Sequence, residues 1–114
     1  MWQHLLPAAG LAPMRNVFSG TLTIDALLGD VHSLKEKRGV IKPILADLNR
    51  RPAVGAAEVD CQDLHRRVVI GVAVVAGSHW RVVELLDDCE GSVDWHPELE
   101  VLSVRRRVHS DEDE

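Results

Sequence analysis

The chain has 114 residues, the size of a single domain, and 46% of them are hydrophobic, so the composition excludes a wholly disordered protein. Aromatic residues make up only 4%, so the core must be built from valine, leucine, isoleucine and alanine. The net charge is −5, and the run Asp111-Glu112-Asp113-Glu114 supplies −4 of it. The rest is nearly neutral, which disfavours bulk attraction to nucleic acid but leaves a local basic patch open.

The first residues read as an appendage rather than as part of the domain. Pro7, Gly10 and Pro13 interrupt this segment, and its leucines show no sustained periodicity. We expect Met1–Pro13 to be a disordered extension or a mis-called start, with Met14 as a second start. The alternative is that Trp2, Leu5 and Leu6 pack on a neighbouring surface.

The domain proper, residues 14–109, begins with a strand and a capped helix. Alternating apolar and polar residues predict a strand over Val17–Leu27, with Thr21, Thr23 and Asp25 on its polar side. Ser33 is the expected helix N-cap with Glu36 three residues on, a capping box. The helix is predicted to end near Arg50, before Pro52.

The second half repeats strand and helix in the order strand, strand, helix, strand. The predicted strands are Val54–Asp60, Arg67–Ala76 and Leu99–Val108. Ser78 is expected to cap a second helix that ends near Gly91, with Trp80, Val83, Leu85 and Leu86 inward. On the last strand, alternation places Val101 and Ser103 on one face and Leu102 and Val104 on the other. Residues 110–114 are expected to be a disordered acidic tail.

The order β-α-β-β-α-β predicts an α+β, ferredoxin-like sandwich. Its antiparallel four-stranded sheet has the order 4-1-3-2, with both helices on one face. The other sheet face is left open to solvent, a second subunit or a ligand. Because Phe18 is the only phenylalanine and alternation places it in the core, the sequence argues against base stacking on sheet aromatics.

Several motifs in a fixed order resemble the YlxP-like family, a group of small bacterial proteins of unknown function. The resemblance runs from about Met14 to Val108 and rests on SLKEKR at Ser33–Arg38, AEVD at Ala57–Asp60 and HPELEV at His96–Val101. Further matching residues are Val40, Ile41, Ile44, Leu45, Gln62, Asp63, Leu64 and the run Gly71–Val75.

The resemblance implies a ferredoxin-like fold. The family's genes often lie among translation-initiation and ribosome-maturation genes, which implies a role near RNA or the ribosome. His65 stands where the family usually has an aromatic residue, often tryptophan, so the chain departs from the family pattern there.

The cations of the first helix are the first candidate site. Lys35, Arg38 and Lys42 can reach one side of the helix, and the positive end of the helix dipole lies close by. The phosphate- or RNA-binding candidates are Lys35, Lys37, Arg38, Lys42 and Arg66. The alternative is a solvated helix face with local pairing to Glu36.

Four polar residues around the end of the second strand form the other candidate cluster: Glu58, Asp60, Gln62 and Asp63. Paired carboxylates can perform acid–base chemistry or hold a hard cation. The structural alternative is a loop cap in which Asp60 and Asp63 accept from turn amides and Gln62 braces the strand. Glu58 then pairs with a cation of the first helix, and we expect such a bridge from Glu58 or Asp60 to join the two signature segments.

The sequence contains no recognisable catalytic device. Cys61, Asp63 and His65 match no zinc-ligand spacing, nor do His79 and Cys89, so we expect free thiols, no metal and no cofactor. There is no nucleophile motif, phosphate loop or dinucleotide fingerprint.

The last predicted strand carries a short basic run. Arg105 and Arg107 should lie on one face of this strand and Arg106 on the other. These arginines could contact RNA, protect the strand edge from pairing with another chain, or pair with the acidic tail.

We therefore expect a non-catalytic protein with ribosomal RNA or the ribosome as partner. The alternative is a homodimeric protein- or small-molecule-binding module that uses the open sheet face or an edge strand.

The N-terminus lacks a basic region ahead of an apolar run, and Val68–Ala76 is too short to span a bilayer. We expect a cytoplasmic location and no membrane partner.

Overall fold

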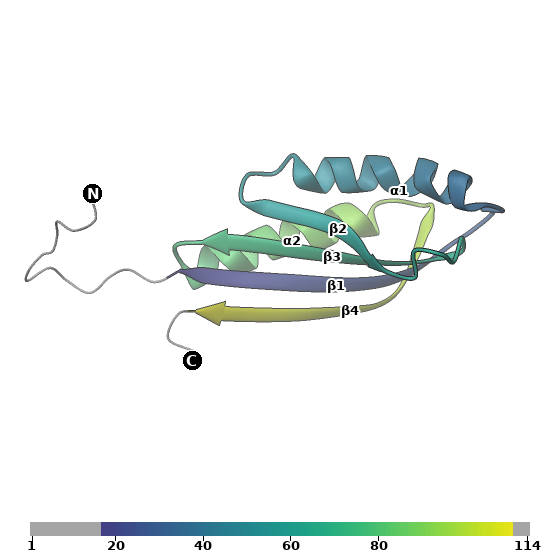
Figure 1. The fold of residues 1–114 in the computed structure, drawn as a ribbon. Helices are drawn as coiled ribbons and strands as arrows, with labels where there is room; N and C mark the ends of the chain where they lie inside the picture. The colour runs from purple at the N-terminus through teal and green to yellow at the C-terminus, as the bar shows by residue number, and fades with distance from the viewer. Residues whose placement is uncertain (1–16, 111–114) are drawn as a thin grey trace, which may run out of the picture.

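The computed structural model describes residues 17–110, so the predictions for Met1–Pro13 and for residues 111–114 of the acidic tail lie outside the described residues, whereas Ser110 belongs to the last strand and not to a tail. Six elements follow one another: β1 (Phe18–Leu28), α1 (Leu34–Asn49), β2 (Val54–Asp60), β3 (Arg67–Ala76), α2 (His79–Asp94) and β4 (Leu99–Ser110). The four strands pair antiparallel in the order β2-β3-β1-β4. This order, shown in Figure 1, confirms the predicted ferredoxin-like fold.

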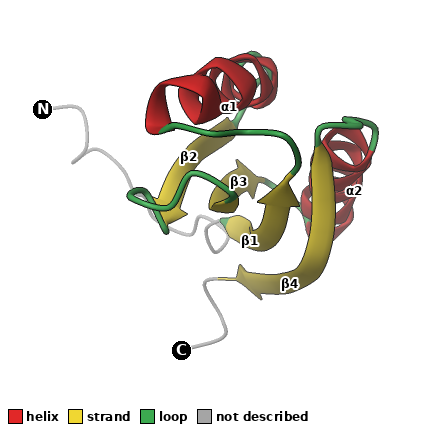
Figure 2. Ribbon diagram, turned by 90° about the vertical axis from the view of Figure 1, so that its right-hand side faces the viewer, coloured by secondary structure: helices red, strands yellow, loops and turns green. Residues whose placement is uncertain are grey.

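Both helices cover the same face of the sheet, with α1 above β2 and α2 beside β4 and β1 (Figure 2). The buried face of β1 consists of alternate residues, including Leu22, Ile24 and Ala26, and β3 adds Ile70 and Val72 opposite them. The period of two places the remaining residues of both strands on the open face. The core therefore lies between the sheet and the helices, and the described helices leave the other face bare.

Two glycines permit close contacts on opposite faces of the sheet. A Cβ atom on Gly20 would lie 2.7 Å from Val82 Cγ1 and 2.8 Å from Leu86 Cδ1, so the missing side chain lets α2 pack directly against β1. On the open face, a Cβ atom on Gly71 would lie 2.8 Å from Val59 Cγ1. Val59 therefore leans over the backbone of β3 and remains 53% exposed.

The start of α1 follows the predicted cap with one difference. Ser33 Oγ accepts a hydrogen bond of 3.1 Å from Glu36 N. The Glu36 carboxylate accepts from His32 N at 2.9 Å, one residue before the N-cap. The reciprocal capping is thus shifted by one residue, yet both groups still satisfy free amides at the helix start.

Trp80 is not inward, contrary to the prediction, because 68% of its surface is exposed. The helix α2 extends to Asp94, beyond the predicted end near Gly91. Its buried side is formed by Val82, Leu85, Leu86, Cys89 and Val93. Trp80 lies off this stripe, because helical spacing from Val82 and Leu86 does not reach it.

A register shift in the pairing of β1 with β4 also changes the predicted faces of the last strand. Ala26 pairs with Val101 and Asp25 with Ser103, so Leu102 is the extra residue. Val101 and Val104 consequently pack on the same side, against the core, instead of on opposite faces. The strand also extends to Ser110, which pairs with Phe18.

Candidate functional site

Lys37, the central cation of SLKEKR, is inside the protein. Its side chain is only 2% exposed, and its Nζ lies 2.6 Å from Glu58 Oε2. The same nitrogen donates to the carbonyl oxygens of Cys61 at 2.8 Å and Leu64 at 2.7 Å. The two carbonyl oxygens accept hydrogen bonds from the ammonium group, and the Glu58 carboxylate balances its charge at ion-pair distance. The expected bridge between the two signature segments is confirmed for Glu58, and Lys37 is not accessible to an external phosphate.

The loop after β2 uses its polar residues to hold its own backbone. Asp60 Oδ1 accepts from Cys61 N at 2.7 Å, and Gln62 Nε2 donates to Glu58 O at 3.4 Å. Cys61 has a φ of 60°, a left-handed conformation that side chains rarely adopt. The loop-cap interpretation is therefore confirmed for Asp60 and Gln62, while the described residues give the Asp63 side chain no hydrogen-bond or ion-pair partner.

A groove beside α1 collects the other cations of the motif. Lys35, Arg38 and Lys42 line a concavity of about 510 Å³, because residues three and four apart share one side of a helix. The rest of this groove is lined by Gly39, Ile41, Leu45 and Glu58. Within residues 17–110, none of the three cations has an ion-pair partner. We call this concavity the α1 groove.

Arg66 lies elsewhere, contrary to its grouping with these cations. Its Nε donates to Leu28 O at 3.3 Å, which ties the end of β1 to the start of β3. It lines a different hollow that also contains Asp30, Glu98 and Glu100. These carboxylates make the hollow unsuitable for a phosphate.

The three arginines of β4 divide between the two faces, as predicted. Arg106 points to the helices, where Nη1 lies 2.9 Å from Asp87 and Nη2 lies 3.0 Å from Glu90. Arg105 and Arg107 are exposed on the other face and have no ion-pair partner among the described residues. They are separated from the α1 groove by the sheet, so the two sets of unpaired cations do not form one surface.

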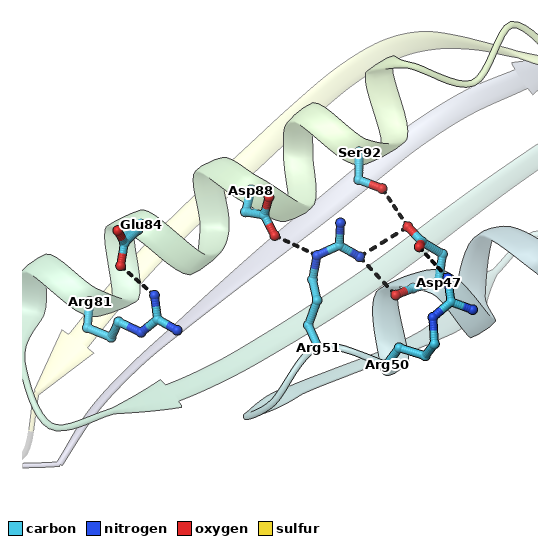
Figure 3. Close-up of polar contacts among 7 residues, drawn as sticks. All are labelled: Asp47, Arg50, Arg51, Arg81, Glu84, Asp88 and Ser92. Atoms are coloured by element: carbon cyan, nitrogen blue, oxygen red, sulfur yellow. Dashed lines mark hydrogen bonds and ion pairs between the residues drawn. The ribbon is translucent and has the colours of Figure 1, made fainter.

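A second polar cluster joins the two helices, and the sequence reasoning missed it (Figure 3). Arg51 binds Asp88 through Nε at 2.6 Å and Asp47 through Nη1 at 3.1 Å. Ser92 donates to Asp47 Oδ2 at 2.8 Å. The hydrogen bond from Ser92, followed by that from Arg51, lowers the pKa of Asp47 below its ordinary value of 3.8. The i,i+4 spacing of Asp47 and Arg51 could have indicated their pairing, whereas Asp88 and Ser92 required the fold.

The thiols and histidines do not assemble into a metal centre in the described part of the chain, where no group of three potential ligands comes together. Cys89 is completely buried, and burial raises the pKa of its thiol. Cys61 is partly exposed. Within the same residues, no helix is both long and apolar enough to cross a membrane.

Comparison with known proteins identifies the family. The family described as "Protein of unknown function (DUF503)" matches residues 19–106, which include α1, β2 and most of β4. The chain belongs to the DUF503 family. Its curated relative "Uncharacterized protein YlxP" of Bacillus subtilis is 32% identical over 86 residues, which cover 75% of this chain and 94% of that protein. The YlxP-like resemblance is therefore confirmed.

Solved structures add little to this DUF503 assignment. The de novo designed protein Foldit4 has a TM-score of 0.49 at 15% identity, covering 82% of this chain and 96% of that one. LarC2, the C-terminal domain of a cyclometallase involved in synthesis of the NPN cofactor of lactate racemase, has a TM-score of 0.31 at 14% identity. That match covers 82% of this chain and 56% of the LarC2 chain. Both scores are below 0.5, so we draw nothing from these two structures.

Proposed function

We propose that this DUF503 protein is a non-catalytic RNA-binding domain that acts near the ribosome and contacts phosphates through the α1 groove. The observation that supports the proposal is the gathering of Lys35, Arg38 and Lys42 in one concavity without ion-pair partners among residues 17–110. Most other described cations are already engaged by carboxylates, as Arg51 and Arg106 are. Cations left unpaired in a concavity are free to replace the counterions of a polyanion.

The reach of the groove also fits a nucleic-acid backbone. Lys35 and Lys42 are seven residues apart on α1, which at 1.5 Å per residue is roughly 10 Å along the helix axis. Adjacent phosphates along a strand are spaced closely enough for two of them to lie within that length. The flexible lysines supply point charges, while Arg38 can bind a phosphate in a bidentate manner.

Salt-dependent binding to ribosomal RNA tests this proposal. The affinity of the full chain for a ribosomal RNA fragment is measured by fluorescence anisotropy at several salt concentrations, and cosedimentation with ribosomal subunits is measured alongside. A triple variant, Lys35→Gln, Arg38→Gln and Lys42→Gln, should bind more weakly. The slope of log affinity against log salt should fall by about 2, since each single-strand phosphate contact contributes about 0.7.

The matched control removes the unpaired cations on the other face of the sheet. The variant Arg105→Gln with Arg107→Gln should keep the wild-type slope, because these residues lie outside the α1 groove. An equal loss of binding in both variants would show only a non-specific charge effect and would overturn the assignment to the groove. Absent binding of the wild-type chain would overturn the RNA proposal itself.

A second candidate function is self-association through the open sheet face. A shallow trough of about 580 Å³ crosses β1, β2 and β3, and its open-face lining is small or apolar: Thr21, Thr23, Gly55, Ala57, Val59, Gly71 and Ala73. Val59 and Val75 leave about half of their surfaces in solvent, at 53% and 48%. Sedimentation velocity over a concentration series tests for a dimer. In that case Val59→Lys should favour the monomer without unfolding the domain.

A further inference from the structure

Glu58 is an unexpected residue in a groove that is proposed to bind phosphate, because its carboxylate is negatively charged. It is the carboxylate that lines the α1 groove, together with Lys35, Arg38 and Lys42. One of its oxygens is held by Lys37 Nζ at 2.6 Å, and 20% of its side chain remains exposed. Because Lys37 itself is fixed by two loop carbonyls, the carboxylate has a defined position in the lining of the groove.

A carboxylate beside three cations selects for a ligand with both an anion and a hydrogen-bond donor. A phosphodiester offers only acceptors, so by itself it would be repelled by Glu58. A ribose 2′-hydroxyl is a donor located on the sugar next to the phosphate, and a deoxyribose has no such group. A 2′-hydroxyl that donates to Glu58 would turn the repulsion into a charge-assisted hydrogen bond.

The rest of the groove has room and chemistry for a sugar. Ile41 and Leu45 contribute apolar surface to the lining of the same groove. A Cβ atom on Gly39 would meet nothing within 4 Å, so the backbone of α1 is uncovered at this point. An apolar wall with an uncovered backbone suits the carbon face of a ribose ring, while the cations hold the phosphate.

We infer that the α1 groove takes a ribose–phosphate unit and distinguishes RNA from DNA through Glu58. The inference rests on the proposed RNA-binding function and names the chemical feature that the groove reads. The same ribose–phosphate chemistry also occurs in free ribonucleotides, so the experiment must separate a polymer from a mononucleotide.

The test compares three oligonucleotides of one single-stranded sequence, made as RNA, DNA and 2′-O-methyl RNA, at one salt concentration. The 2′-O-methyl group keeps an oxygen but loses the donor. Wild-type protein should bind RNA about tenfold or more tightly than either analogue, as expected for a hydrogen bond to a charged acceptor. Competition by adenosine monophosphate at concentrations comparable to the oligonucleotide would assign the site to free nucleotides and would overturn the polymer assignment.

The variant Glu58→Gln then assigns the preference to the carboxylate. Removing the charge should weaken RNA binding and strengthen DNA binding, so that the ratio moves toward one. Loss of charge repulsion alone would strengthen the binding of RNA as well as DNA, so weaker RNA binding is the outcome that assigns the 2′-hydroxyl contact to Glu58. Asp63→Asn is the matched control, since Asp63 lies on the loop after β2 but does not line the groove, and it should keep the wild-type ratio.

The outcomes separate the two proposals. Equal binding of RNA, DNA and 2′-O-methyl RNA that still depends on the three groove cations would overturn the inference and leave the proposed function standing. No binding of any oligonucleotide would overturn the proposed function. If Glu58→Gln does not fold, as judged by circular dichroism, the comparison of the three oligonucleotides on wild-type protein still decides the inference.

Discussion

Two ion-paired links tie α1 to neighbouring elements, and they differ chiefly in their exposure to water. Near its start, Lys37 is 2% exposed and joins α1 to the loop after β2. Near its end, Asp47 and Arg51 join α1 to α2 through Asp88 and Ser92 (Figure 3). All four of these side chains are partly or fully exposed. A buried charge must keep its partners, whereas an exposed one can exchange them for water. The first link should therefore be essential for folding and the second a modest addition.

Breaking the buried link should have the largest effect. Lys37→Met leaves the Glu58 carboxylate without its cation and two loop carbonyls without their donor, so the free energy of unfolding should fall by about 3–5 kcal/mol. Urea denaturation followed by circular dichroism measures this change. Lys35→Met, two residues away on the exposed side of α1, should change stability by no more than about 0.5 kcal/mol.

A double variant shows which part of the buried link matters. Lys37→Met combined with Glu58→Leu removes both charges but still leaves the carbonyls of Cys61 and Leu64 unsatisfied. It should regain only part of the lost stability, because each unsatisfied buried acceptor costs about 1–3 kcal/mol. Full recovery would show that the ion pair alone matters and that the tie to the loop does not.

Breaking the exposed link should have a smaller effect. Asp47→Ala removes the acceptor of Ser92 and one partner of Arg51, and it should lower the free energy of unfolding by about 1 kcal/mol. Asp94→Ala is the control, because Asp94 is exposed and has no ion-pair partner within residues 17–110. A loss as large as that of Lys37→Met would contradict the role assigned to burial.

Gly39 lies within α1, and its replacement by alanine tests whether the helix or the α1 groove requires a glycine at this position. Gly39→Ala should stabilise the protein by about 0.5–1 kcal/mol, because alanine is the better helix former and its Cβ meets open space. The same Cβ would enter the α1 groove, so RNA affinity should fall while thermal stability rises. Gly91→Ala in α2 should give a similar gain in melting temperature without affecting RNA binding.

The smallest effect concerns pH. Hydrogen bonds from Ser92 to Asp47 and from Arg67 to Asp25 lower the pKa values of both carboxyls below 3.8. Each contribution to stability is present above the pKa of the unfolded chain and is lost as pH falls through the lower folded value. The free energy of unfolding should therefore decrease below about pH 4. Asp47→Asn should reduce this pH dependence, as measured by urea denaturation at a series of pH values.

The sequence determined the elements and their order. Alternation in β1, the valine-rich run of β3, the cap at Ser33 and the helical spacing of Ile41, Ile44 and Leu48 are local patterns. Local patterns depend on few distant contacts. The right-handed crossover rule then left one strand order. The fold and the sharing of one helix side by Lys35, Arg38 and Lys42 could be predicted for this reason.

Only the tertiary structure decided what each cation does. Lys37 lies between Lys35 and Arg38 in SLKEKR, yet it is buried because β2 and its loop bring one carboxylate and two carbonyls to the inner side of α1. The bulge that moves Val104 to the core and the exposure of Trp80 likewise depend on packing between distant elements. A sequence motif indicates which charges are present, but the arrangement of its neighbours determines which of them are satisfied inside the protein and which remain for a ligand.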